Sequence, residues 1–298
     1  MNEPVTQLDD GFARLTRFRI VFSYDGTDFF GWAKQPELRT VQGVLLEAMA
    51  VIFGESEDDF GIRVAGRTDA GVHALNQQAH FELSDAQLER LGRSQSAIEN
   101  PSYLANRLNS LLPSDVRIHS VSVAPEGYDA RFSAIYRRYR YRIADAKVTK
   151  NPLQARYTLW VEQELDELAM QVAALGLLGL NDFASFCRSR PDATTIRELR
   201  EVVVSRNRSD GGVIEVELLA DAFCHNMVRS IVGALVAVGE GRATADDVKR
   251  ILDRASRTES FKVVAPHGLT LLEIGYPADS ELASQAEKAR NMRSLDSN

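Results

Sequence analysis

The sequence is poor in cysteine and has no long hydrophobic run. Its two cysteines, Cys187 and Cys224, lie far apart and lack C-x-x-C spacing. That spacing predicts neither a disulfide framework nor a zinc site, so we interpret both residues as ordinary thiols. No apolar run is long enough to span a bilayer, and residues 1–10 are acidic and polar rather than basic and then apolar. These absences predict a cytoplasmic protein without a membrane partner.

Two motifs of nucleotide and base chemistry are also missing. The sequence contains no G-x-x-x-x-G-K-[ST], which excludes a P-loop for nucleotide hydrolysis. His80-Phe81-Glu82 resembles the H-x-E element of zinc-dependent base deaminases, but the P-C-x-x-C that those sites require is absent. We therefore predict no metal site, and we expect His80 to be an ordinary strand residue.

The net charge of −7 is distributed unevenly along the chain. Its acidic excess is concentrated in residues 1–14, 55–59, 162–167 and 279–298, and the rest of the chain is net positive. Residues 131–142 contain five arginines and no acid. Because phosphates respond to the local field more than to the net charge, the sequence is compatible with an RNA partner.

The predicted elements repeat one order twice. Strands are expected at 18–24, 64–65, 77–83, 116–123, 138–144, 197–206, 213–219 and 269–276, and helices at 41–53, 103–112, 165–178, 223–238 and 245–252. Apart from the extra helix at 245–252, each half reads β-α-β-β-α-β. We predict an α+β fold of two ferredoxin-like or RRM-like halves that form one extended antiparallel sheet with a central cleft.

The sequence predicts bounds for the two halves and for the segments at either end of the chain. Residues 1–16 are expected to be a flexible leader, 17–130 the N-terminal half, 131–277 the C-terminal half and 278–298 a flexible polar tail. Ser84 to Asn100 is polar and is predicted to be a surface insertion.

The stretch from Val64 to Leu83 is predicted to be a strand, a tight loop and a second strand with Asp69 in the loop. Gly66 and Gly71 flank the loop and permit a positive φ or close approach to a ligand. An aspartate in such a loop can also serve turn chemistry alone. The loop by itself does not distinguish these two interpretations.

The helix predicted at 223–238 is apolar nearly all round and contains one certain charge, Arg229. A buried guanidinium requires a carboxylate partner, whereas one on an exposed stripe can reach water unaided. We favour the buried interpretation and expect Arg229 to pair with Asp69 where the two halves meet. Arginine would hold the carboxylate ionised, and an ionised carboxylate can act as a nucleophile.

Strand alternation divides the basic segment after Arg131 into two sides. Arg137, Tyr139 and Tyr141 lie on one side, and we predict that all three contact substrate, because aromatic rings among arginines suit stacking on an unpaired base. The alternative is an ordinary strand with tyrosines in the core and arginines in water. Alternation does not indicate which side faces the cleft.

Five motifs together resemble the TruA family of tRNA pseudouridine synthases. They are A-G-R-T-D-A-G-V-H at 65–73, Y-D-G at 24–26 with F-G-W at 30–32, R-F-S-A with R-R-Y-R-Y at 131–141, N-D-F at 181–183, and F-x-H-N-M-V-R at 223–229. The resemblance runs from about residue 17 to 276. It implies a homodimeric, cofactor-free enzyme that isomerises uridine to pseudouridine at positions 38–40 of the tRNA anticodon stem-loop.

The resemblance also implies roles for individual residues. Asp69 matches the nucleophile, Arg229 its ion-pair partner and Tyr139 the aromatic residue that contacts the target base. Arg67 matches the arginine that displaces the base, and Leu269 an apolar residue beside the site. The alternative is a non-catalytic RNA-binding module with an RRM-like sheet, but a carboxylate beside anionic RNA would weaken mere binding.

Overall fold

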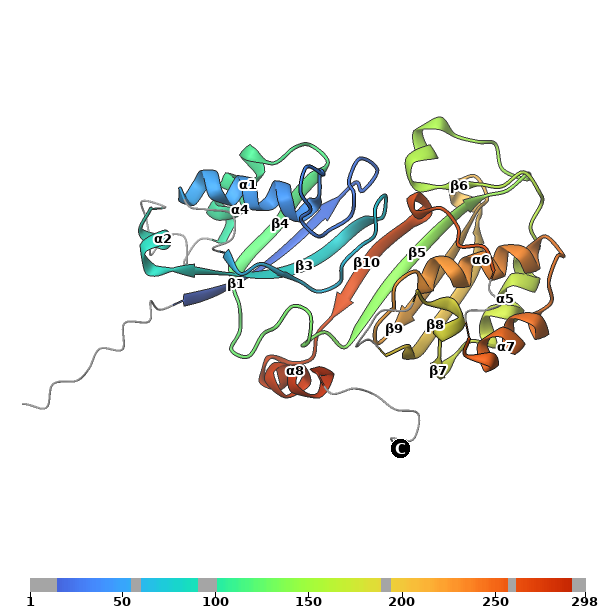
Figure 1. Ribbon diagram of the computed structural model, residues 1–298. Helices are drawn as coiled ribbons and strands as arrows, with labels where there is room; N and C mark the ends of the chain where they lie inside the picture. The colour runs from blue at the N-terminus through green and yellow to red at the C-terminus, as the bar shows by residue number, and fades with distance from the viewer. Residues whose placement is uncertain (1–14, 55–59, 91–100, 189–193, 257–260, 291–298) are drawn as a thin grey trace, which may run out of the picture.

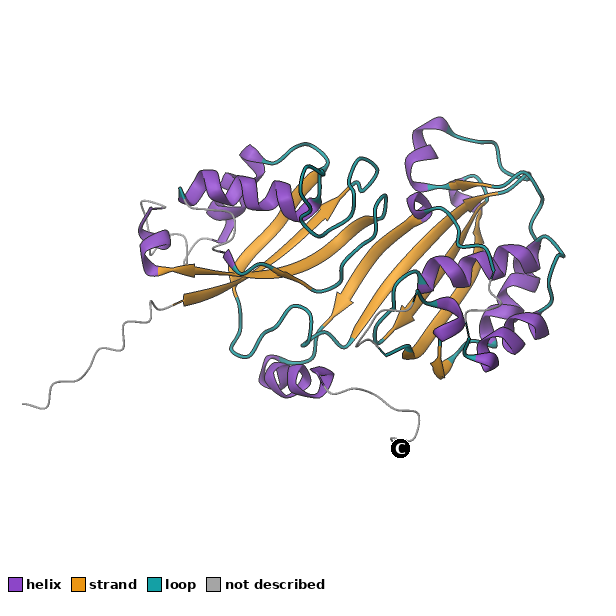
Figure 2. Cartoon of the chain, in the orientation of Figure 1, coloured by secondary structure: helices purple, strands orange, loops and turns teal. Residues whose placement is uncertain are grey.

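The computed structural model describes residues 15–54, 60–90, 101–188, 194–256 and 261–290. One ten-stranded sheet runs through this described part of the chain. Most helices fall into two groups, one beside the strands of each half, and the last helix lies apart from both, below the junction of the halves, as Figure 2 shows. No helix in these described ranges is long and apolar enough to cross a membrane.

The N-terminal half follows the predicted order. Its elements are β1 (Leu15–Tyr24), α1 (Val41–Phe53), β2 (Arg63–Val64), β3 (His73–Ser84), α2 (Asp85–Arg90), α4 (Pro101–Leu111) and β4 (Val116–Val123). The Thr40 side chain accepts a hydrogen bond from the Gly43 N–H and so caps the start of α1, and Gly54 ends the helix in the left-handed conformation. Its buried residues belong to the same hydrophobic core as the apolar residues of β1 and β3.

The C-terminal half repeats this order with additions (Figure 1). Its strands and α-helices are β5 (Tyr136–Ala144), β6 (Leu159–Trp160), α5 (Glu167–Leu175), β7 (Gly179–Asp182), β8 (Ile196–Asn207), β9 (Val213–Ala220), α6 (Met227–Gly239), α7 (Ala245–Arg254), β10 (Leu269–Gly275) and α8 (Leu282–Arg290). The short 3₁₀ helices are η2 (Pro152–Tyr157), η3 (Ala184–Phe186), η4 (Arg208–Asp210), η5 (Pro266–Gly268) and η6 (Asp279–Glu281).

The strand order is β4-β1-β3-β10-β5-β9-β8-β7, with β2 paired to β3 and β6 paired to β5. The predicted α+β fold with a large, mostly antiparallel sheet is confirmed. The junction differs, because β3 and β10 pair in parallel, His73 opposite Thr270 and Ala74 opposite Leu271. The two-residue β2 covers β3 only at Ala79 and His80, so the start of β3 is left free to pair with β10.

Two local predictions are wrong. The helix predicted from Phe223 begins at Met227, because Asn226 adopts a left-handed backbone (φ 67°) that a right-handed helix cannot include. Within the predicted tail, residues 282–290 form α8, with the Leu282 and Ala286 side chains buried. The predicted surface insertion is described only as far as Arg90, where α2 exposes Asp85, Ala86, Glu89 and Arg90 and buries Leu88; residues 91–100 lie outside the described ranges. The predicted leader also lies outside them, except for Leu15 and Thr16, which begin β1.

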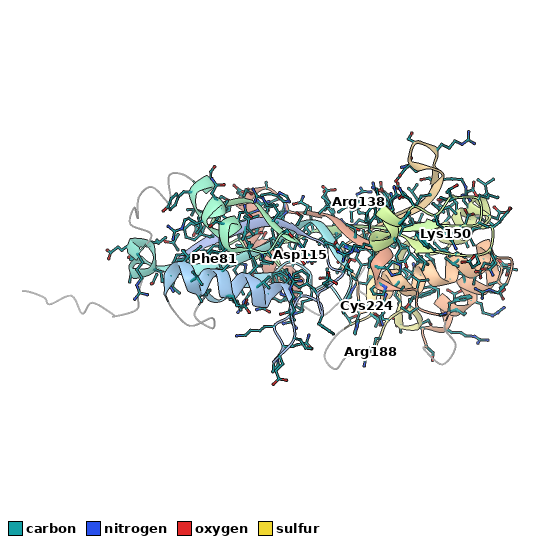
Figure 3. The ribbon with its side chains drawn as sticks, turned by 90° about the horizontal axis from the view of Figure 1, so that it is seen from above. Phe81, Asp115, Arg138, Lys150, Arg188 and Cys224 are labelled. Carbon is teal, nitrogen blue, oxygen red and sulfur yellow. A yellow bond between two sulfur atoms is a disulfide. The ribbon has the colours of Figure 1, made fainter. Side chains whose placement is uncertain are left out.

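The prediction of two ordinary thiols is also wrong. Cys187 and Cys224 form a disulfide, with Cα atoms 5.7 Å apart, a normal separation for such a bridge. Figure 3 shows Cys224 close to Arg188, whose backbone N–H donates to the His225 carbonyl at 2.8 Å. The disulfide and this hydrogen bond tie the segment after η3 to the loop that precedes α6.

Three of the four arginines of β5, Arg138, Arg140 and Arg142, lie on the side of the sheet away from Cys224, as Arg138 shows in Figure 3. They form an ion-pair ladder with acidic residues of β8, β9 and η4: Arg138 with Glu201 (2.5 Å), Arg140 with Glu217 (2.7 Å), and Arg142 with Asp210 (2.6 Å) and Glu215 (2.8 Å). Carboxylates therefore neutralise most of the basic segment identified in the sequence.

Candidate active site

A cleft of about 890 Å³ opens where the two halves meet. Its walls are the β2–β3 loop, β5 and the segment before it, the start of β8, the loop before α6 with the first turn of that helix, the start of β10, and α8. The volume is typical of a site that encloses a small ligand or one part of a larger one. Asp69, Arg67, Tyr139, Arg229 and Leu269, all predicted as site residues, line this cleft.

The backbone of the Asp69 loop is fixed by the segment that follows β1. The Trp32 N–H donates to the Thr68 carbonyl (3.1 Å), and the Gly71 N–H donates to the Phe29 carbonyl (3.2 Å). Gly71 has φ +77°, a left-handed conformation that favours glycine. The loop is thus rigid, while the Asp69 side chain remains 33% exposed to the cleft.

Two cationic or potentially cationic side chains face the Asp69 carboxylate. Arg229 Nη1 lies 3.6 Å from Asp69 Oδ2, and His225 Nε2 lies 3.4 Å from Asp69 Oδ1. Arg229 is itself held by the Val264 carbonyl, to which its Nε donates at 2.8 Å. The two halves therefore meet at this carboxylate, as expected for Arg229.

His225 was not predicted. The helix predicted from Phe223 includes His225, and within such a helix its side chain would have no reason to turn toward Asp69. The true start of α6 leaves residues 223–226 as a loop whose side chains can face the cleft. The sequence feature that could have identified His225 as a site residue is its position in the F-x-H-N-M-V-R motif.

Tyr139 lies beneath the Asp69 loop. A Cβ added to Gly66 would lie 3.9 Å from the Tyr139 hydroxyl, and the tyrosine ring packs edge-on against Phe223 with centroids 5.2 Å apart. Burial raises the pKa of Tyr139, and the nearby Tyr24 and Asp69 raise it further. Its hydroxyl therefore stays protonated at neutral pH and can donate a hydrogen bond.

Tyr24 and Gln77 support the loop from below, and neither was predicted as a site residue. The Tyr24 hydroxyl lies 2.8 Å from Thr68 Oγ1, and the Gln77 amide donates to both the Tyr24 hydroxyl (3.1 Å) and the Gly66 carbonyl (2.9 Å). Burial raises the pKa of Tyr24 to about 12, so it too remains protonated. This buried network holds the backbone on both sides of Arg67.

Arg137 and Tyr141, the other two predicted substrate-binding residues, lie in different surroundings in the structure. Arg137 lines the cleft, but its guanidinium donates to the backbone carbonyls of Ala65, Arg131 and Asp221 and so braces the walls. Tyr141 is fully buried, donates to the Ala265 carbonyl at 2.7 Å and is not among the cleft residues. The prediction of direct contact is wrong for Tyr141, because it packs beneath Gly268 in the core.

The residues that suggested a zinc deaminase do not form such a site. His80 lies in β3, where its Nδ1 accepts a hydrogen bond from the Ala130 N–H at 3.0 Å, and burial lowers its pKa to about 4. Among the described residues, no group of three or more His, Cys, Asp or Glu side chains could hold a metal ion. His80 is thus an ordinary strand residue, as predicted.

Comparison with known proteins identifies the class. The tRNA pseudouridine synthase family matches residues 20–133 and 173–277. The matched segments include the Asp69 loop, most of the segment before β5, the loop before α6 and β10. The chain belongs to the tRNA pseudouridine synthase family and is an isomerase, as the motifs predicted.

The chain matches relatives from several bacteria over nearly their whole length, and these relatives have a more specific name. The chain is 50% identical to tRNA pseudouridine synthase A of Leifsonia xyli subsp. xyli over 285 residues, which cover 94% of this chain and 98% of that one. It is 46% identical to tRNA pseudouridine synthase A of Streptomyces avermitilis, with 97% of each chain covered, and 45% identical to that of Mycobacterium leprae, with 93% and 96% covered.

Proposed function

We propose that this protein isomerises uridine to pseudouridine at positions 38–40 of the tRNA anticodon stem-loop, with Asp69 as the nucleophile. One observation carries the proposal: a carboxylate on a rigid loop faces a cleft, with Arg229 and His225 on its two oxygens and Tyr139 beneath it. The family and the names of its relatives support tRNA as the substrate. We place the enzyme in the cytoplasm for the same reason.

The reaction breaks the N1–C1′ glycosidic bond, rotates the uracil and joins C5 to C1′. N1 gains a proton and C5 loses one, so atoms and charges balance without a second substrate. A base inside a stem or a stacked loop must leave its neighbours before this can happen. Arg67 is exposed at the cleft and is suited to fill the gap, while Tyr139 supports the extruded base.

Asp69 can begin the reaction in three ways. The carboxylate can attack C1′, attack C6 of the uracil, or remove a proton from the sugar. All three start from an ionised carboxylate, and Arg229 Nη1 lies 3.6 Å from the carboxylate oxygen Oδ2 of Asp69. A non-catalytic RNA-binding module would gain nothing from this carboxylate, since it repels phosphate.

The position of the modified uridine can be tested on tRNA transcripts labelled with tritium at C5 of uracil. Tritium is expected to be released from a transcript with a single labelled uridine at position 38, 39 or 40. Equal release from a transcript whose only labelled uridines lie outside the anticodon stem-loop would contradict the assignment. Mapping pseudouridines in total tRNA from cells that lack the protein tests the same point in vivo.

We also propose that the enzyme acts as a homodimer. Leu168, Val172 and Leu175 of α5 are 75%, 62% and 51% exposed and follow the i, i+4, i+7 spacing of one helix face. Leu180 of the adjacent edge strand β7 and Val203 of β8 are exposed as well. Exposed apolar surface of this kind marks protein–protein interfaces, and a second copy of the chain would cover it.

The double substitution Leu168→Glu, Val172→Glu is expected to convert a dimer into a monomer, because two carboxylates would be buried without partners at the interface. Light scattering coupled to gel filtration measures the mass. Val51→Glu is the control, since Val51 is 70% exposed on α1 in the other half. A wild-type protein with the mass of one chain, or a double variant that still dimerises, would contradict this interface.

A further inference from the structure

The C-terminal helix α8 has two faces of different character. Leu282 and Ala286 are buried, whereas Gln285, Lys288 and Ala289 line the cleft. The latter three follow i, i+3, i+4 spacing, so they share one side of the helix. In Figure 1 the helix lies below the junction of the two halves, at the end of β10. The sequence predicted a flexible tail here, so this wall of the cleft was not anticipated.

The buried face of α8 is anchored to the segment between β4 and β5. A Cβ added to Gly127 would lie 2.7 Å from the Ala283 Cβ, so the two backbones approach closely. Ser133 Oγ donates to the Leu282 carbonyl at 3.0 Å. The helix therefore docks on the connection between the two halves, rather than extending freely from the sheet.

The far end of α8 is fixed to the turn that leads into β5. Arg290 lies 3.5 Å from Asp129 and stacks over the Phe132 ring at 5.0 Å. Asp129 also accepts hydrogen bonds from the backbone N–H groups of Arg131 and Phe132, both at 2.9 Å. The anchored helix and the turn thus present Lys288 and Arg131 to the same cleft.

The charge of the cleft suits a polyanion. Among its lining residues in the described ranges, eight are arginine or lysine and two are aspartate, Asp69 and Asp221. The single glutamate of α8, Glu287, is not among the residues that line the cleft. An RNA strand whose target base lies at Asp69 must leave the cleft along the cleft walls. The phosphates that flank the target base would meet exposed cations there.

We propose that α8 is a second RNA-binding element of this enzyme, in which Lys288 contacts a phosphate of the tRNA strand next to the target nucleotide. The inference rests on the proposed function, because it takes tRNA as the substrate. Lys288 contributes to affinity and orientation, and it takes no part in the chemistry at Asp69. Gln285 and Ala289 provide the uncharged surface on which the backbone lies.

The test measures tRNA affinity as a function of salt concentration. Lys288→Ala is expected to raise KM for tRNA about three- to tenfold with kcat unchanged, and to reduce the slope of log Kd against log salt by about one. A lysine that only stabilises the end of α8 would leave that slope unchanged. Ala289→Glu, which places a carboxylate on the same face, is expected to weaken binding in the same direction.

Lys249→Ala is the matched control. Lys249 lies on α7, pairs with Asp253 and is not among the cleft residues, so its loss is expected to leave KM and the salt slope at their wild-type values. If Lys288→Ala and Lys249→Ala both behave like the wild type while the wild type modifies tRNA, the proposal for α8 is overturned. If the wild type neither binds nor modifies tRNA, the proposed function itself has failed.

Discussion

Asp69→Asn is expected to lower tritium release from C5-labelled tRNA by at least about 1,000-fold, a loss typical of removing a nucleophile. The amide keeps the shape of the side chain on a loop that Trp32 and Phe29 hold in place, so the cleft should be unchanged. Affinity for tRNA is expected to stay within a few-fold of the wild type, or to improve, because a negative charge facing phosphate has been removed.

The controls separate chemistry from folding. Asp28→Asn makes the same change at an exposed residue of the N-terminal half that pairs with Arg156 and is not among the cleft residues, and its activity should match the wild type. Asp69→Ala guards against trace activity from asparagine that has reverted to aspartate. Turnover by Asp69→Ala above about a tenth of the wild-type rate would sink the assignment of Asp69 as nucleophile.

Arg229→Met is expected to reduce kcat about 100-fold, since one preorganised charged group beside the reacting carboxylate is lost. The free energy of unfolding should fall by about 1–2 kcal/mol, from a lost hydrogen bond to the Val264 carbonyl and a partly solvated ion pair. Tritium release and thermal unfolding measure the two effects separately.

Two further substitutions sharpen this prediction. Arg229→Lys keeps the charge but cannot reproduce the guanidinium contacts with both Val264 and Asp69, so its activity should lie between that of the wild type and Arg229→Met. Arg250→Met removes an exposed arginine of α7 that pairs with Asp247, and it should change neither activity nor stability appreciably. Wild-type turnover by Arg229→Met would refute the role of the pair.

The Asp69 loop was predictable because its sequence signal is local. Arg229 was predictable because burying a lone charge costs free energy. Two glycines around a short polar segment indicate a tight loop, whatever the rest of the chain does. A lone charge in an otherwise apolar helix demands a partner. The repeated β-α-β-β-α-β order then indicated that the two residues would meet at the junction of the halves.

The role of β5 could not be deduced in the same way. Alternation correctly separated Arg137, Tyr139 and Tyr141 from the arginines on the other side of the strand. It did not indicate how deeply each of these side chains is buried. Tyr139 reaches the cleft, whereas Tyr141, two residues further along the same side, is covered by Gly268 and donates to the Ala265 carbonyl. Which residues of one strand face become core is decided by the segments that pack on them.

By itself, the sequence determined the α+β class, the repeated order of elements, the candidate carboxylate and its arginine, because these follow from periodicity, turn chemistry and the energetic cost of burying charge. Only the tertiary structure decided the parallel junction of β3 with β10, the approach of His225 to Asp69, the Cys187–Cys224 disulfide and the position of α8. Each of these depends on contacts between segments far apart in the chain, and such contacts leave no periodic pattern in the sequence.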